Sequence, residues 1–80
     1  PHIMKLFPNP AQNQLDIELF TNYQPFSLLI YNKDGKVYGN LSTETNTLQI
    51  SLDNFEDGVY LIALSVNGIV FDIKRFIVSK

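Results

Sequence analysis

Few residue types in this chain could perform catalysis. Its single histidine is His2, and it contains no cysteine. His2 lies beside the first residue, where ordering is poorest, so neither a Ser-His-Asp triad nor a Cys-His pair can be assembled. The same composition excludes disulfides and thiolate zinc sites. We therefore expect no metal and no cofactor.

Carboxylates are the remaining candidates for acid and base chemistry. Asp16 and Glu18 alternate with apolar residues and would share one strand face, as a paired acid and base could. Asp53, Glu56 and Asp57 cluster in one turn and could offer oxygen ligands to Ca²⁺. The cluster lacks the spaced ligand series of a calcium loop, and no glycine-rich phosphate loop is present. We interpret both groups as solvated surface, and the chain as a protein that is not an enzyme.

Charge and hydropathy limit the classes of partner that this chain could bind. The net charge is −2, and no apolar run is long enough to cross a bilayer. The basic residues are scattered, which argues against a nucleic-acid partner. They are Lys5, Lys33, Lys36, Lys74, Arg75 and Lys80.

Aromatic side chains offer an alternative binding function. Phe20, Tyr23, Tyr31 and Tyr38 occur where we expect exposed positions. If they formed a contiguous patch, it could bind sugar or protein. A carbohydrate-binding or adhesion module of a cell-surface enzyme is therefore the alternative reading of this chain.

The hydrophobic pattern predicts the elements that position these residues. Leu15, Ile17 and Leu19 alternate with polar residues, which is typical of a strand with one solvated face. Residues 26–31 form a denser apolar run and predict a central strand. Turn signals recur at short intervals, and eighty residues suffice for one domain. We predict an all-β fold, a seven-stranded antiparallel immunoglobulin-like β-sandwich.

Two dipeptides predict hairpins and their register. Asp34-Gly35 and Asn67-Gly68 both suit two-residue turns with positive φ. Closing the first hairpin pairs Tyr31 with Tyr38 and Leu28 with Leu41. Closing the second pairs Val66 with Ile69, Leu64 with Phe71, and Ile62 with Ile73, all on one face.

The register of the second hairpin must change further along its second strand. Without this change, Arg75 would lie opposite Tyr60 on the core face, where an unpaired guanidinium is costly. A β-bulge near Lys74-Arg75 would instead place Phe76 opposite Tyr60 and Val78 opposite Gly58, so we predict a bulge or an early strand end at this point. The alternative is an edge strand from which Arg75 reaches solvent.

Tyr60 follows an Asp-Gly corner at the start of a predicted strand. In many sandwich domains a tyrosine at such a corner enters the core and hydrogen-bonds to nearby backbone. We predict this role for Tyr60, with Ile62, Leu64 and Val66 buried on the same face.

Four short motifs occur in order along the chain. They are F-P-N-P-A at residues 7–11, L-I-Y-N-K-D-G-K at residues 29–36, D-G-V-Y-L-I at residues 57–62 and K-R-F-I-V at residues 74–78. In this order and spacing the chain resembles the C-terminal sorting domains of type IX secretion cargo from Bacteroidetes-type bacteria. Each motif alone is weak, because turn residues recur in many proteins, but the four together are specific.

The resemblance covers residues 6–80 and leaves residues 1–5 as a linker or a cloning remnant. It implies a non-catalytic signal that follows an N-terminal cargo domain in the same chain. The implied partners are the outer-membrane translocon, a shuttle protein and a sortase-like peptidase that removes the domain at the surface. The implied location is the periplasm in transit and then the cell surface or the medium.

The resemblance also implies which residues are recognised. Gly35 and Gly58 have an alternative role in backbone geometry, and Tyr60 has one in its corner. The candidates are Pro8, Asn9 and Pro10 in the first motif, Gly35 and Lys36 in the second, Gly58 and Tyr60 in the third, and Lys74, Phe76 and Val78 in the last.

Overall fold

The computed structural model describes residues 4–20 and 25–80, and these form seven strands and no helix. The predicted all-β sandwich is therefore confirmed. The strands are β1 (Met4–Phe7), β2 (Gln14–Leu19), β3 (Phe26–Asn32), β4 (Val37–Thr43), β5 (Thr47–Ser51), β6 (Gly58–Val66) and β7 (Ile69–Val78).

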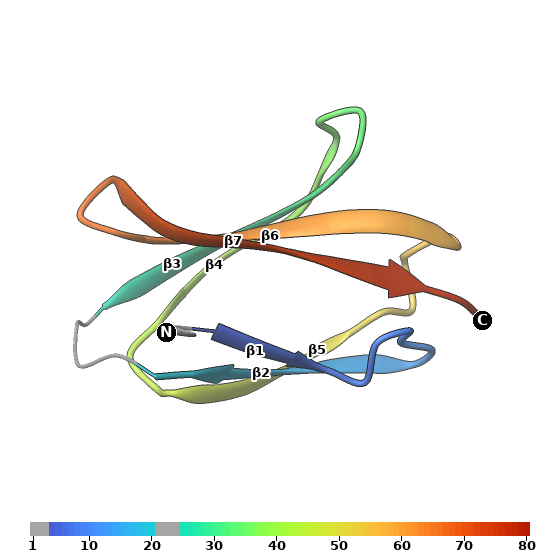
Figure 1. Ribbon diagram of the computed structural model, residues 1–80, viewed down its shortest axis with the longest axis horizontal. Helices are drawn as coiled ribbons and strands as arrows, with labels where there is room; N and C mark the ends of the chain where they lie inside the picture. The colour runs from blue at the N-terminus through green and yellow to red at the C-terminus, as the bar shows by residue number, and fades with distance from the viewer. Residues whose placement is uncertain (1–3, 21–24) are drawn as a thin grey trace.

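The strands form two antiparallel sheets that pack face to face (Figure 1). One sheet has the order β1-β2-β5, and the other has the order β4-β3-β6-β7. β3 lies inside its sheet, as its dense apolar run predicted. No helix in the described part of the chain is long and apolar enough to span a membrane.

The core lies between the sheets and follows the alternation in the sequence. Leu15, Ile17 and Leu19 of β2 are all buried, while the residues between them are only partly buried. Burial of such side chains stabilises the fold by about 1.5–3 kcal/mol each before entropy is counted. The other buried apolar residues are Met4, Ala11, Phe26, Leu28, Ile30, Leu52, Phe55, Tyr60, Ile62, Ala63, Leu64, Val66, Phe76 and Val78.

β1 begins within the segment that the sequence assigned to a linker. Met4 and Lys5 both belong to β1, where they pair with Leu19 and Glu18 of β2. The Met4 side chain is fully buried and therefore contributes to the core. His2 and Tyr23, which the sequence analysis singled out, lie outside the described residues.

The β3–β4 hairpin has one predicted pair and lacks the other. Leu28 pairs with Leu41, as predicted. The register then shifts after Ile30, so that Tyr31 lies opposite Val37. The predicted pair of Tyr31 with Tyr38 is wrong, because the irregularity adds one residue to β4.

The β6–β7 hairpin turns at the predicted dipeptide, with φ of 53° at Asn67 and 80° at Gly68. Beyond the turn the register shifts between Leu64 and Ser65, which leaves Phe71 as the extra residue on β7. The bulge therefore lies at Phe71, three to four residues before the predicted position near Lys74-Arg75. An earlier bulge still lets Arg75 face away from the core.

With this register, two predicted pairs are confirmed and two are corrected. Phe76 lies opposite Tyr60 and Val78 lies opposite Gly58, as predicted. The predicted pairs of Leu64 with Phe71 and of Ile62 with Ile73 are wrong. After the bulge Asp72 pairs with Leu64 and Lys74 pairs with Ile62, while Phe71 and Ile73 are exposed.

Candidate functional site

Parts of all four motifs lie at one end of the sandwich, which we call the motif end and define as residues 8–11, 34–36, 56–60 and 76–80. This end carries the β1–β2 loop, the start of β6 and the end of β7, at the right of Figure 1, and the β3–β4 hairpin, which rises at the top of the same view. Antiparallel pairing explains this gathering. Where one strand ends at the motif end, the next strand in the sequence begins there, so the turn between them lies at the same end. Direct contacts join the motifs in pairs.

The first motif covers the edge of the last strand. The Asn9 Oδ1 accepts a hydrogen bond from the Ile77 N–H at 3.0 Å. The Ala11 N–H donates to the Ile77 carbonyl at 2.7 Å, and the Ser79 N–H donates to the Ala11 carbonyl at 2.8 Å. Pro8 and Pro10 flank Asn9, are exposed, and follow cis peptide bonds. The segment therefore fixes the end of β7 and displays two prolines beside it.

The second and third motifs meet through aromatic rings. The Tyr60 ring lies 5.0 Å from the Tyr38 ring, edge to face, and 5.5 Å from the Phe76 ring, stacked. Phe55 completes the cluster at 5.0 Å from both tyrosines. The Lys36 Nζ lies 5.1 Å from the Tyr38 ring centroid, within the range of a cation–π contact. A basic side chain of the hairpin is thus held beside the start of β6.

Tyr60 occupies the predicted corner. Its side chain is only 3% exposed, and its hydroxyl donates to the Glu56 carbonyl at 2.6 Å. Burial raises the pKa of Tyr60, and the neighbouring Tyr38 raises it further against the lowering effect of the Glu56 carbonyl. The group is neutral at neutral pH, and its contacts are those of a core residue.

Gly35 and Gly58 meet backbone requirements at two turns. Their φ values are 88° and 155°, which residues with a Cβ rarely adopt. A Cβ at either position would meet no atom within 4 Å, so conformation and not crowding selects glycine. In the first turn the Asn32 Oδ1 accepts from the Asp34 and Lys36 N–H groups, both at 2.9 Å. This fixes the backbone from which Lys36 projects.

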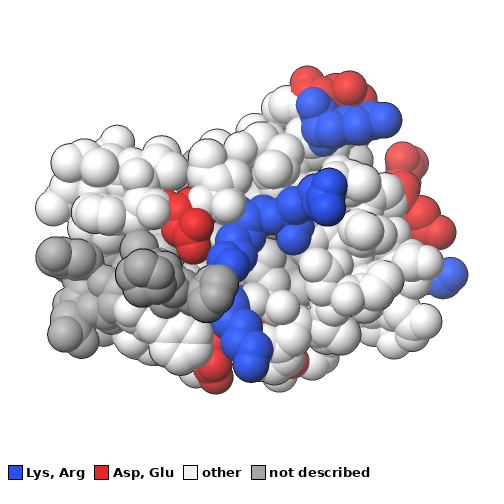
Figure 2. Space-filling view, viewed as in Figure 1, with Lys and Arg blue, Asp and Glu red and all other residues white. Residues whose placement is uncertain are grey.

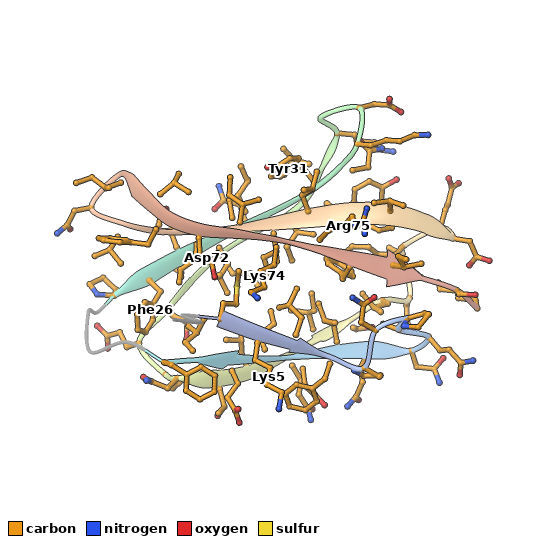
Figure 3. The ribbon with its side chains drawn as sticks, in the orientation of Figure 1. Lys5, Phe26, Tyr31, Asp72, Lys74 and Arg75 are labelled. Atoms are coloured by element: carbon orange, nitrogen blue, oxygen red, sulfur yellow. The ribbon has the colours of Figure 1, made fainter. Side chains whose placement is uncertain are left out.

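Lys74 lies away from the motif end, on the side of the molecule where β1 and β7 face each other (Figure 3). A groove of about 580 Å³ lies there. Lys74 shares it with Lys5 and Arg75, and Figure 2 shows a blue band crossing this face. Sequence spacing does not reveal this band, because 69 positions separate Lys5 from Lys74.

The predicted acidic groups do not gather into a ligand set. Among residues 4–20 and 25–80, no three His, Cys, Asp or Glu side chains are placed to hold a metal ion. The Asp57 Oδ1 instead accepts from the Lys80 N–H at 3.0 Å, which ties the chain end to the third motif. The Gln14 Nε2 lies 3.3 Å from the Asp16 Oδ1 on β2.

The described aromatic residues do not form the contiguous platform that the alternative function requires. Tyr38 packs against Phe55 and Tyr60. Phe20 lines the groove beside β1, and Tyr31 projects from the opposite face of its sheet (Figure 3). These three rings therefore lie on separate parts of the surface.

The chain is similar to one known family along almost its entire length. The family described as the secretion system C-terminal sorting domain matches residues 5–79. No curated protein matches the chain.

Proposed function

Because the chain belongs to the family of secretion system C-terminal sorting domains, we propose that its motif end is the surface by which the type IX system recognises it. The family assignment makes the domain a sorting signal for export to the cell surface or the medium. The gathering of four sequence-distant motifs at one end supports the finer proposal. A partner could contact all four motifs only on the folded domain.

Burial and backbone role divide the candidate residues of the motif end into three groups. Tyr60, Phe76 and Val78 are buried, so we assign them to folding. Pro8, Pro10 and Lys36 are exposed at the motif end, and we propose that the partner contacts these directly. Asn9, Gly35 and Gly58 hold the backbone that presents them.

We propose that recognition occurs after an N-terminal cargo and this domain have reached the periplasm. A shuttle protein and the outer-membrane translocon would bind the motif end, and a sortase-like peptidase would then remove the domain at the surface. The domain would act as substrate and signal throughout. Its lack of cysteine and its single histidine, at position 2, are consistent with that role.

Export of a reporter tests this proposal. Residues 1–80 are fused behind a fluorescent protein that carries a signal peptide, in a host with a type IX system. We expect fluorescence at the surface or in the medium, and retention in the periplasm without the domain. Equal export with and without the domain would contradict the proposal.

The variant Lys36→Ala then tests the motif end. We expect weaker export with the unfolding midpoint lowered only modestly, since the side chain is exposed. Lys33→Ala is the matched control, because it removes the same charge from the same hairpin outside the candidate set. Export by Lys36→Ala at the unmodified level would place recognition elsewhere.

A further inference from the structure

β7 is an edge strand. The β1–β2 loop hydrogen-bonds to its outer edge near Ile77, whereas the same edge around Ile73 and Arg75 is open to a further strand. In the described part of the chain it pairs as a strand only with β6. Its edge-facing groups at Ile77 bond to Asn9 and Ala11. No register shift occurs between Asp72 and Val78, so the N–H and C=O groups of Ile73 and Arg75 point to the same edge. These groups have no protein partner among the described residues.

The open edge borders the groove between β1 and β7. Lys5 reaches the groove from β1 and Lys74 reaches it from β7, while Arg75 borders it from the outer face of the same edge (Figure 3). Asp72 lies two residues before Lys74 on the same face of β7 and offsets part of this charge. The groove therefore carries half of the six basic residues of a chain whose net charge is −2.

The outer face of the same edge carries aliphatic side chains on either side of Arg75. Ile73 is 52% exposed and Ile77 is 36% exposed, and both alternate with the groove-facing residues of β7. Leu29 and Val59 are also exposed and lie on this outer face of the sheet. A strand added at the edge would thus lie beside Lys74 on the groove face and beside Ile73 and Arg75 on the outer face.

We propose that an extended acidic segment of a partner protein adds as a strand to the open edge of β7. Its backbone would pair with Ile73 and Arg75, its acidic side chains would enter the groove near Lys5 and Lys74, and its aliphatic side chains would cover Ile73. Strand addition of this kind obtains affinity from the main chain and specificity from alternate side chains. The inference rests on the proposed function, since it places the segment on a protein of the export route.

Charge favours this occupant over a second copy of the chain. Antiparallel pairing that uses Ile73 and Arg75 of both copies would be centred on Lys74 and would set the two Lys74 side chains opposite each other, and like charges opposite one another destabilise a sheet. An acidic strand meets the same side chains with the opposite sign. The occupant is therefore a different segment, with carboxylates at alternate positions.

Binding of a synthetic peptide tests the edge directly. The probe is Val-Glu-Val-Glu-Val with blocked ends, and Val-Lys-Val-Lys-Val is its control. We expect the acidic peptide alone to slow amide hydrogen exchange at Ile73 and Arg75 and to bind more weakly as salt is raised. Equal binding of both peptides, or protection elsewhere on the domain, would overturn the proposal.

Variants separate the backbone contribution from the charge contribution. Ile73→Pro removes an edge-facing N–H that the β6 ladder does not use, so the fold tolerates it better than an inner position would. The double variant Lys5→Glu with Arg75→Glu keeps the backbone and should weaken peptide binding by about tenfold or more. Lys33→Glu is the matched control and should bind as the unmodified domain does. Unchanged binding by the double variant would overturn the proposal.

Three further results distinguish the competing readings. Self-association in sedimentation experiments that the double variant abolishes would assign the edge to a second copy. Binding to lipopolysaccharide vesicles without peptide binding would assign the basic band to an anionic lipid. In the export assay, retention of the unmodified fusion would refute the sorting function itself. Export of both the unmodified fusion and the double variant would refute only the edge.

Discussion

The two halves of β7 pair with the same strand and bury their side chains very differently. In residues 69–73, Ile69 is 62% exposed and Ile73 is 52% exposed. In residues 74–78, Phe76 is fully buried and Val78 is 1% exposed. Both halves are rich in large apolar residues, so composition does not cause the difference.

The bulge at Phe71 and the first motif produce the contrast. After the bulge, Asp72 and Lys74 take the inward positions beside the groove, and Phe76 and Val78 take those over the core. Asn9 then covers the edge of the final half only. One strand thus supplies stability at one end and leaves an apolar edge accessible at the other.

Replacing Phe76 should show this contrast at its largest. Phe76→Ala leaves a cavity beside the Tyr60 and Phe55 rings and should cost about 3–5 kcal/mol of unfolding free energy. A domain of this size has only about 4–8 kcal/mol in total, so the variant should be close to unfolded. Urea denaturation followed by circular dichroism measures the change. Ile73→Ala on the exposed half is the control, and an equal loss there would refute the contrast.

Removing the Tyr60 hydroxyl should have the next largest effect on the final half. Tyr60→Phe keeps the ring stack with Phe76 and loses the bond to the Glu56 carbonyl. We expect the free energy of unfolding to fall by about 1–2 kcal/mol, because the Glu56 carbonyl loses the hydroxyl that donates to it. Tyr31→Phe, on the outer face, is the matched control and should change stability little.

Tyr60→Phe should also change how the stability of the domain depends on pH above 10. The folded pKa of Tyr60 is raised above its ordinary value of 10.0, so folding favours the protonated form. The stability that the protonated Tyr60 contributes is fully present below pH 10 and is lost as pH rises through the folded pKa. The unmodified domain should therefore lose stability more steeply above pH 10 than Tyr60→Phe does. Parallel curves for the two proteins would contradict the burial of this group.

The sequence allowed the fold to be predicted wherever local rules decide it. Alternation placed Leu15, Ile17 and Leu19 in the core, and the Asp-Gly corner placed Tyr60 there with a bond to nearby backbone. The bulge was predicted at the wrong position because the pairing assumed that the apolar residues of β7 point inward. Phe71 and Ile73 break that assumption, since an edge strand can expose large apolar residues.

The site was less predictable because its contacts span the whole chain. The motif resemblance located the candidate residues, but no local pattern indicates that Asn9 accepts a bond from Ile77, 68 positions away. Lys5 likewise joins Lys74 only because β1 and β7 lie on the same side of the two sheets. Such meetings depend on strand order, and sequence spacing does not encode it.

Replacing Asn9 should loosen the covered end of β7 by a smaller amount. Asn9→Ala removes the acceptor of the Ile77 N–H, an exposed hydrogen bond, and should cost about 1 kcal/mol or less. Hydrogen exchange at the Ile77 amide should accelerate, while exchange at the Leu64 amide in β6 should follow global stability only. Asn40→Ala, an exposed asparagine on β4, is the control. Unchanged exchange at Ile77 would mean that Asn9 does not hold this edge.

The smallest effect should come from a polar replacement on the open half. Ile73→Thr keeps a β-branched side chain suited to a strand, and we expect less than about 0.5 kcal/mol of change because the position is exposed. Val78→Thr makes a comparable change on the covered half, where the buried hydroxyl should cost about 1–3 kcal/mol. Thermal unfolding of the two variants compares the halves directly. If Ile73→Thr proved the costlier of the two, the exposed half would be contributing to the fold, and its proposed availability to a partner strand would be refuted.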